Sequence, residues 1–283
     1  MATKDIAFLS ATELGTAIQA KEISPVEAVE AYLERIDRID PQVNSYITVT
    51  AEQARQEALV ADKEIRGGNY RGPLHGIPMV IKDQIYTKDV CPTDPSQIRS
   101  EFVPKFDATV VTNLKNAGAI MLGKLNMAEF AHGEPQSSYY GAARNPWDLT
   151  RSPGVSSTGS GAATAARLCA TSLGEDTGGS IRGPAANCGL VGLRPTWGRV
   201  SRYGVDGAGW SFDTLGPISR TVSDCAITIA GIAGYDPLDP STHKVPVPDY
   251  LAALTGDIKG LKVGVVKELI DPEELDLDPQ MRQ

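Results

Sequence analysis

The chain has 283 residues, and its 27 lysines and arginines against 35 aspartates and glutamates give a formal net charge of −8 at pH 7. This acidic balance argues against a nucleic-acid-binding surface spread over the whole chain. With 41% hydrophobic and 22% charged residues, the composition excludes global intrinsic disorder, and the length allows one large domain or two ordinary ones.

The first 70 residues read as helices whose ends carry clear signals. Residues 24–27 form a capping box with proline at the first helical position, and an amphipathic pattern follows until Pro41, which we expect to end the helix. A second box at 50–53 predicts a polar, alanine-rich helix that ends at the glycines of 67–68. We therefore expect residues 1–70 to form a helical segment that packs on a core made by residues 71–283.

From Gly72 onward, short apolar runs alternate with helical patterns. The expected strands are 77–81, 119–122 and 261–266, and the expected helices run from Asp107 through Leu114 and from Thr221 to Gly234. Because such alternation needs crossover connections, it predicts a sheet with substantial parallel character and helices on both faces. Mostly acidic and polar residues follow the last expected strand, so we expect the C-terminal part of a longer protein to be missing.

Residues 152–166 contain almost only glycine, serine, threonine and alanine after their proline, so they cannot fill a core. One interpretation is a flexible linker. However, the segment runs into AARLCATSL at 165–173, which has the pattern of a buried small-residue helix and a strand. This context favours close backbone packing over flexibility.

The cysteines and the apolar stretches indicate in which cellular compartment the protein is expected. The four cysteines, at positions 91, 169, 188 and 225, fit neither a CxxC metal site nor a dense disulfide framework, so we expect them to be reduced. The sequence shows no signal peptide and no stretch approaching the ~18 apolar residues of a membrane span. These observations predict a cytoplasmic protein with no membrane partner.

Three familiar catalytic patterns fail on their chemistry. Residues 118–124 satisfy GxxxxGK, but Leu125 stands where a P-loop needs a serine or threonine for magnesium. Arg182 stands where the nucleophile elbow of an α/β-hydrolase, centred on Ser180, needs a glycine. The three histidines form no HExxH pattern, so a zinc hydrolase is disfavoured and no metal site is expected.

A serine and a lysine remain as candidates. Ser180 follows two glycines, and the backbone N–H groups of such a loop can converge on a developing oxyanion, although a simple turn between strands fits equally well. Lysine can replace histidine as the base for a serine nucleophile. Lys82 directly follows the apolar run 77–81, where burial would favour the neutral amine; the alternative is a side chain that reaches solvent.

Three segments resemble the consecutive hallmarks of the amidase signature family. They are GPLHGIPMVIKD at 72–83, SPGVSSTGSGAATAA at 152–166, and GEDTGGSIRGPAANCGLVGLRPTWGRVSRYG at 174–204. NMAEFAHG, GAARNPWDLTRSPG and DTLGPISRTVSD are also similar to that family's sequence. The resemblance covers essentially the whole chain in the right order, and it implies an α/β fold: a three-layer α/β/α sandwich around a central mixed β-sheet.

The resemblance also implies a catalytic triad. Carried over by position, the family's Ser-Ser-Lys triad falls on Ser180 as the nucleophile, Ser156 as the middle serine and Lys82 as the base. Ser156 precedes Ser180 by 24 residues, the spacing usual in the family, and this favours it over the adjacent Ser157. The chemistry needs neither a metal nor an organic cofactor.

The loop around the nucleophile has further implied roles. The family's oxyanion hole falls on the backbone N–H groups of Thr177, Gly178, Gly179 and Ser180. Asp176 and Arg182 are expected to pair and to hold this loop. Val155 and Thr158, however, stand where the family has glycines. If those positions require a positive φ, a β-branched residue costs roughly 1 to 3 kcal/mol, which would distort the loop or lower the activity.

The function implied by the resemblance is that of an amidase. It would hydrolyse the C–N bond of a small-molecule carboxamide to an acid and ammonia or an amine through an acyl-enzyme, and a homodimer is compatible with it. The identity of the amide is left open, because part of the family's pocket lies in the segment expected to be missing.

Two alternatives stay open. The first is the A subunit of glutamyl-tRNA(Gln) amidotransferase, a glutaminase that passes ammonia to a partner subunit; partner subunits and tRNA belong to this alternative alone. GRVSRYG at 198–204 is similar to that protein, whereas VDGAGWSFDTLGP at 205–217 looks more like a free-standing amidase. The second alternative is a catalytically silent family member, or a fragment, that serves as a binding scaffold.

Overall fold

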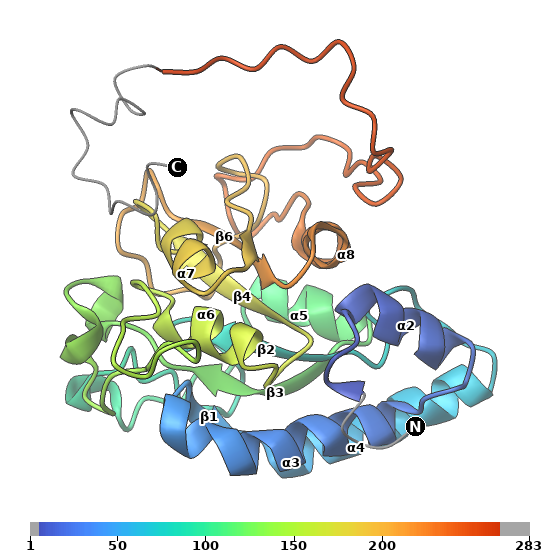
Figure 1. Cartoon of the computed structure of the whole chain (residues 1–283), viewed down its shortest axis with the longest axis horizontal. Helices are drawn as coiled ribbons and strands as arrows, with labels where there is room; N and C mark the ends of the chain where they lie inside the picture. The colour runs from blue at the N-terminus through green and yellow to red at the C-terminus, as the bar shows by residue number, and fades with distance from the viewer. Residues whose placement is uncertain (1–5, 267–283) are drawn as a thin grey trace. The chain divides into compact units, whose positions relative to one another are not determined.

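A six-stranded mixed sheet lies at the centre of the computed structural model, which describes residues 6–266 (Figure 1). The strands are β1 Tyr46–Val49, β2 Pro78–Lys82, β3 Ile120–Leu125, β4 Thr171–Asp176, β5 Val191–Gly192 and β6 Thr214–Ser219. Their order in the sheet is β1-β3-β2-β4-β6-β5. The central strand β2 pairs in parallel with β3 and β4, and the other pairs are antiparallel. The predicted mixed sheet is therefore confirmed.

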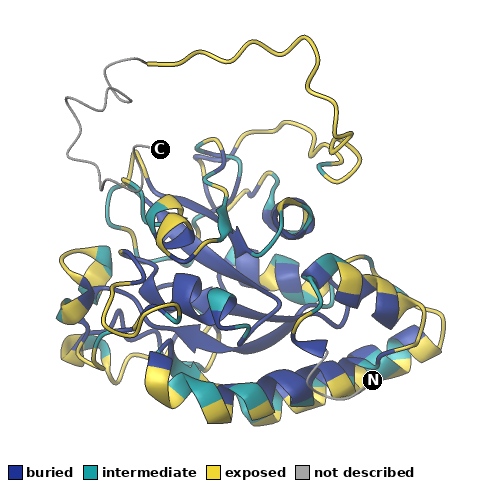
Figure 2. Cartoon of the chain, viewed as in Figure 1, coloured by how far each residue is buried: buried dark blue, intermediate teal, exposed yellow. Residues whose placement is uncertain are grey.

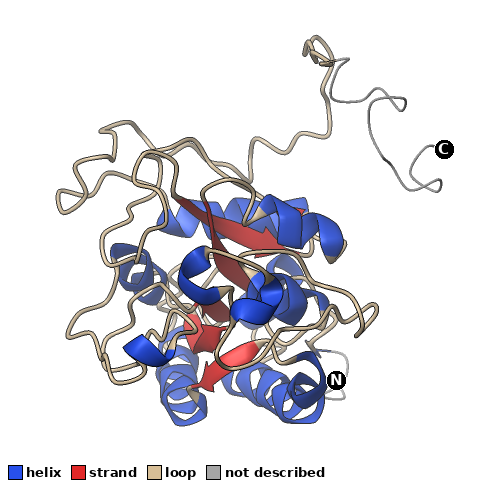
Figure 3. Ribbon diagram, turned by 90° about the vertical axis from the view of Figure 1, so that its left-hand side faces the viewer, coloured by secondary structure: helices blue, strands red, loops and turns tan. Residues whose placement is uncertain are grey.

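Helices cover both sides of this sheet, which gives the three layers of the expected α/β/α sandwich (Figure 3). The helices are α2 Ala11–Gln19, α3 Pro25–Val43, α4 Ala51–Arg66, α5 Thr109–Asn116, α6 Thr158–Ala165, α7 Arg182–Asn187 and α8 Val222–Ile232. Helix α6 packs across β2, β3, β4 and β6, and α8 packs on β4, β5 and β6. Figure 2 shows the central strands of the sheet buried and the outer helix faces exposed. Within residues 6–266, no helix combines the length and the apolar character needed to cross a membrane.

The first long helix, α3, begins as predicted but ends later. The Ser24 hydroxyl accepts from the Glu27 N–H at 3.1 Å, and the Glu27 carboxylate accepts from the Ser24 N–H at 2.8 Å, so the capping box is present. Pro41 lies inside the helix, and the prediction that it ends the helix is wrong. A proline in the last turn removes only its own N–H bond. The helix ends at Val43, and its C-cap residue, Asn44, has a left-handed φ of 54°.

The second capping box is also wrong, although its helix is present. The Thr50 hydroxyl donates to the carbonyl of Met121 at 3.0 Å instead of capping α4. Thr50 is engaged because β1, a strand that the sequence did not predict, pairs with β3 directly before the helix. The helix ends at Arg66, as the two following glycines predicted. The division of the chain at residue 70 stays a prediction.

The small-residue segment 152–166 forms a loop and the buried helix α6, so the linker interpretation is wrong. A Cβ added to Gly159 would lie 2.3 Å from the carbonyl oxygen of Ser45, a clash that only glycine avoids. Val155 and Thr158 do not adopt a positive φ, whereas Gly154 does, at 90°. The backbone strain expected from these two β-branched residues is therefore absent.

The strand expected at 261–266 is not formed. Residues up to 251 belong to one compact unit and residues from 252 to another, and residues 252–266 hold neither helix nor strand. The apolar side chains of this run are exposed, with Val263 at 83%. A strand needs a neighbour for its backbone groups, and residues 252–266 contain no second strand that could supply one. The mostly acidic and polar residues at 267–283 lie outside the described part.

Candidate active site

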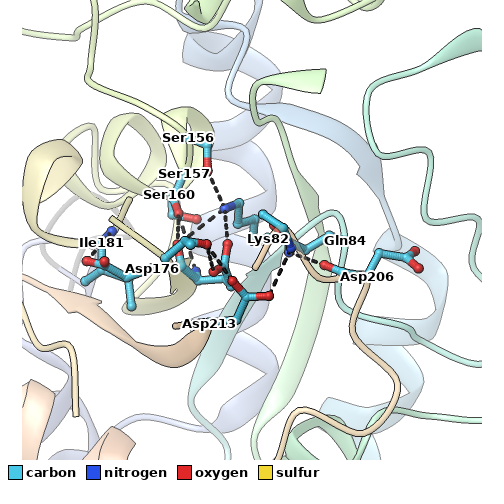
Figure 4. Close-up of polar contacts among 12 residues, drawn as sticks. Lys82, Gln84, Ser156, Ser157, Ser160, Asp176, Ile181, Asp206 and Asp213 are labelled. Atoms are coloured by element: carbon cyan, nitrogen blue, oxygen red, sulfur yellow. Dashed lines mark hydrogen bonds and ion pairs between the residues drawn. The ribbon is translucent and has the colours of Figure 1, made fainter. Parts of the chain in front are cut away.

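Lys82 is the last residue of β2, and its side chain is fully buried. Its Nζ lies 2.7 Å from the Ser156 hydroxyl oxygen, 3.1 Å from a carboxylate oxygen of Glu175 and 3.3 Å from the Glu175 carbonyl oxygen (Figure 4). The alternative in which this lysine reaches solvent is excluded. Burial lowers the pKa of Lys82, while the charge and hydrogen bond of Glu175 act in the opposite direction.

Ser156 reaches Lys82 from the loop before α6. The peptide bond between Val155 and Ser156 is cis, and the Ser156 side chain is almost completely buried. The hydroxyl of the adjacent Ser157 donates instead to the carbonyl of Glu175 at 3.2 Å. Of the two neighbouring serines, the one favoured by spacing is thus the one in contact with the lysine.

The turn after β4 is organised by Asp176. Its carboxylate accepts from the backbone N–H groups of Gly179 at 2.7 Å and Ile181 at 3.1 Å, and it accepts two side-chain bonds from Arg182, each of 3.0 Å. Burial alone would raise the pKa of Asp176, but these hydrogen bonds hold it below its ordinary value. The expected pair of Asp176 and Arg182 is present, and the carboxylate is ionised at neutral pH.

Ser180 lies on this turn and is half-buried. Within residues 6–266, its hydroxyl has no hydrogen-bond partner, so the structure does not join it to Ser156 directly. Among the four N–H groups predicted to form an oxyanion hole, that of Gly179 is taken by Asp176. The N–H groups of Thr177, Gly178 and Ser180 have no acceptor in the described chain and are available to a ligand.

A cleft of about 670 Å³ opens beside this turn. Its lining includes Ser180, Gly178 and Val155, and also His132, Glu134 and Gln136. The cleft thus exposes the available N–H groups and the serine to a substrate. Among the described residues, no cluster of histidine, cysteine, aspartate or glutamate side chains could hold a metal ion.

Sequence reasoning missed Glu175, which contacts Lys82. The residue stands next to Asp176 in the segment GEDTGGSIRGP, directly before the loop that carries the candidate nucleophile. A signal was present: Glu175 belongs to the run TSLGED, which forms the fully buried strand β4, and a buried carboxylate requires a partner. The sequence did not reveal that this partner is Lys82.

Comparison with known proteins shows which family the chain belongs to. The model of the Amidase family matches residues 27–283. The chain therefore belongs to the Amidase family, as its sequence motifs predicted.

Particular relatives are similar over most of the chain. The A subunit of glutamyl-tRNA(Gln) amidotransferase from Geobacter metallireducens is 52% identical over 270 residues, which cover 94% of this chain and 56% of the relative. The corresponding protein of Moorella thermoacetica is 50% identical, over 93% of this chain and 54% of its own length. The chain thus spans about half the length of the curated relatives that it matches.

Solved structures of two kinds are also similar. The native peptide amidase from Stenotrophomonas maltophilia matches with a TM-score of 0.81 at 39% identity, over 86% of this chain and 52% of that one. The A subunit of glutamyl-tRNA(Gln) amidotransferase from Thermotoga maritima matches with a TM-score of 0.70 at 37% identity, over 87% of this chain and 50% of that one.

Proposed function

We propose that this protein is an amide hydrolase that cleaves a carboxamide C–N bond with Ser180 as nucleophile, Ser156 as proton relay and Lys82 as base. The observation that carries the proposal is the buried 2.7 Å contact between Lys82 Nζ and the Ser156 hydroxyl. Burial lowers the pKa of Lys82, which favours the neutral amine that a base requires. The adjoining cleft holds Ser180 beside available backbone N–H groups.

The proposed acylation step moves one proton along the three side chains. As the Ser180 oxygen bonds to the amide carbon, its proton passes to Ser156, and the proton of Ser156 passes to the neutral amine of Lys82. The carbonyl electron pair moves to the oxygen, which the free N–H groups of Thr177, Gly178 and Ser180 stabilise.

The remaining steps return the proton and release the products. When the C–N bond breaks, Lys82 returns the proton through Ser156 to the leaving ammonia or amine. A water molecule then attacks the acyl-enzyme by the same relay, which releases the acid and restores Ser180. Neither a metal nor an organic cofactor enters these steps.

The relay requires the Ser180 hydroxyl to turn toward Ser156 when substrate is bound. The unpartnered hydroxyl of Ser180 in a half-buried position supports this, because no hydrogen bond within the described chain opposes the rotation. Catalytic hydrogen bonds are often long or incomplete before substrate binds.

The experiment that tests the nucleophile is labelling with a fluorophosphonate probe, followed by mass spectrometry of the modified peptide. We expect the probe on Ser180 in the unmodified chain and no labelling in Ser180→Ala, whose amide hydrolysis should fall by about 10³-fold or more. Labelling that persists in Ser180→Ala would refute the assignment. No labelling of the unmodified chain would favour the silent scaffold.

A pair of variants tests the relay. Ser156→Ala removes the hydroxyl that contacts Lys82, so we expect a rate loss of about 10²-fold or more. Ser157→Ala is the matched control, because it removes a neighbouring buried hydroxyl that, within residues 6–266, bonds only to the backbone of Glu175. A larger loss in Ser157→Ala than in Ser156→Ala would contradict the proposed relay.

A second candidate function is that of an amidotransferase subunit, in which the same chemistry releases ammonia from glutamine for a partner. The observation that favours it is the 50–52% identity to proteins named as the A subunit of glutamyl-tRNA(Gln) amidotransferase, over 93–94% of this chain. Hydrolysis of glutamine only in the presence of partner subunits and tRNA would support this candidate. Turnover of other carboxamides by the protein alone would support the free-standing amidase.

A further inference from the structure

A buried carboxylate outside the Ser-Ser-Lys set lies against the proposed base. Glu175 is 1% exposed and sits in the fully buried strand β4. One carboxylate oxygen is 3.1 Å from Lys82 Nζ, and the other is 2.9 Å from the Thr177 hydroxyl, whose single proton is shared with the Asp213 carboxylate at 2.6 Å. Burying a charge is expensive unless it is paired. The position of Glu175 therefore bears directly on the chemistry of Lys82.

The contacts of Nζ restrict where its lone pair can point. An ammonium group has three N–H bonds, and within the described chain Nζ has three hydrogen-bond partners: the Ser156 hydroxyl, the Glu175 carboxylate and the Glu175 carbonyl. A neutral amine has two N–H bonds and one lone pair. The carbonyl and an ionised carboxylate only accept, so they require the two N–H bonds. The lone pair is left facing Ser156, whose hydroxyl can donate to it.

We propose that Glu175 is a positioning residue that aims the lone pair of Lys82 at Ser156, and that its negative charge sets the pH above which this lone pair is available. The proposal rests on the proposed function of Lys82 as a base. Glu175 acts through the lysine and takes no part in bond formation with the substrate.

Other charges around Lys82 are more distant or already compensated. The charged groups that act on it are Glu175 and Asp176 on β4 and Asp213 before β6. Two further charged residues are neighbours along the chain or the sheet: Asp83 follows Lys82, and Lys124 lies on the adjacent strand β3. Asp176 is paired with Arg182, and Lys124 donates to backbone carbonyls. Among these groups, Glu175 is the one whose carboxylate contacts Nζ. Removing its charge should therefore have the largest effect on the protonation of the lysine.

The direct test follows the titration of Lys82 by NMR in the full chain labelled with ¹³C-lysine, with the Lys82 signal assigned by its absence in Lys82→Arg. Glu175→Gln keeps the shape and one oxygen acceptor but removes the charge. In this variant we expect the titration midpoint of Lys82 to fall by about one pH unit or more. The acidic limb of its pH–rate profile should move to lower pH by the same amount. Glu30→Gln, at an exposed pair with Arg55, removes the same charge and should change neither.

Equal midpoints in the unmodified chain and Glu175→Gln, or a higher midpoint in the variant, would overturn the role of the charge. If Glu175→Gln does not fold, Glu175→Asp provides the test, because it keeps the charge but withdraws it from Nζ by one methylene. A midpoint lower than that of the unmodified chain supports the proposal, and an unchanged midpoint overturns it.

The positioning role has its own readout, measured at a pH above all midpoints so that charge no longer matters. At such a pH, kcat of Glu175→Ala should be about tenfold or more below that of the unmodified chain, with KM nearly unchanged. Glu175→Gln should keep most of the kcat of the unmodified chain. Equal kcat values in the two variants would overturn the positioning role. The NMR titration does not require turnover, so a shifted midpoint in a chain that hydrolyses no amide would refute the proposed function while leaving the effect of the charge intact.

Discussion

Two fully buried lysines lie on neighbouring parallel strands, and they have different surroundings. Lys82 is the last residue of β2. Lys124 on β3 pairs in register with Ile81, the residue before Lys82. Burial lowers the pKa of both. Lys124 donates to the carbonyl oxygens of Asp83, at 2.8 Å, and Ile85, whereas Lys82 faces a hydroxyl and a carboxylate.

The difference teaches that burial alone does not make a lysine a base. A carbonyl oxygen accepts a hydrogen bond but has no proton to exchange, whereas a serine hydroxyl both accepts and donates. Lys124 therefore acts as a clamp that holds the turn after β2. That turn directly follows Lys82, so the clamp also fixes the end of the strand that carries the proposed base.

The largest expected effect is a loss of activity on substitution of Lys82, which distinguishes it from Lys124. Lys82→Arg should lose about 10³-fold or more in kcat/KM, because a guanidinium stays protonated and cannot accept a proton. Initial rates of amide hydrolysis measure this, and the thermal unfolding curve controls for loss of fold. Normal turnover by Lys82→Arg would mean that the residue supplies only charge or packing.

The next largest effect is on stability, and it is expected at Lys124 and not at Lys82. Lys124→Met keeps an apolar stem but leaves two buried carbonyl groups without donors, so we expect the free energy of unfolding to fall by about 3 kcal/mol. Urea denaturation measures the loss, and the rate per folded molecule should stay within about tenfold of the unmodified chain. An unchanged unfolding free energy would contradict the proposed clamp.

A smaller effect appears in the pH dependence of stability. Since burial lowers the pKa of Lys124, the unfolded chain binds a proton that the folded chain lacks between the folded pKa and the unfolded value of about 10.4. The free energy of unfolding should therefore rise with pH in this window, by at most about 1.4 kcal/mol per pH unit for this group, and fall as pH drops toward the folded pKa. Urea denaturation at a series of pH values should give a flatter curve for Lys124→Met; parallel curves would argue against the shift.

The smallest effect concerns the turn that Lys124 holds. The Asp83 carboxylate accepts from both the N–H and the hydroxyl of Thr93, at 2.6 and 2.8 Å. Thr93→Val removes only the hydroxyl bond, so we expect a loss of about 1 to 2 kcal/mol in the free energy of unfolding with little change in activity. A rate loss as large as that of Lys82→Arg would show that this turn shapes the reaction itself.

Local signals in the sequence predicted much of the fold. The capping box at Ser24 and the apolar run before Lys82 place α3 and β2, because caps and burial patterns act over a few residues. Strands that depend on a distant neighbour were less predictable. Strand β1 was missed and the run at 261–266 was wrongly predicted, since pairing with a partner, and not apolar content, decides whether a strand forms.

The same division applies to the candidate site. The sequence by itself determined that a lysine ends a buried strand, that Ser156 has the family's spacing to Ser180, and that Asp176 and Arg182 flank the turn. Only the tertiary structure decided what faces the lysine. Glu175 is 93 residues away in the chain, and it meets Lys82 because β4 pairs in parallel with β2. A contact of that range exists only when the sheet is assembled, and no local pattern around either residue encodes it.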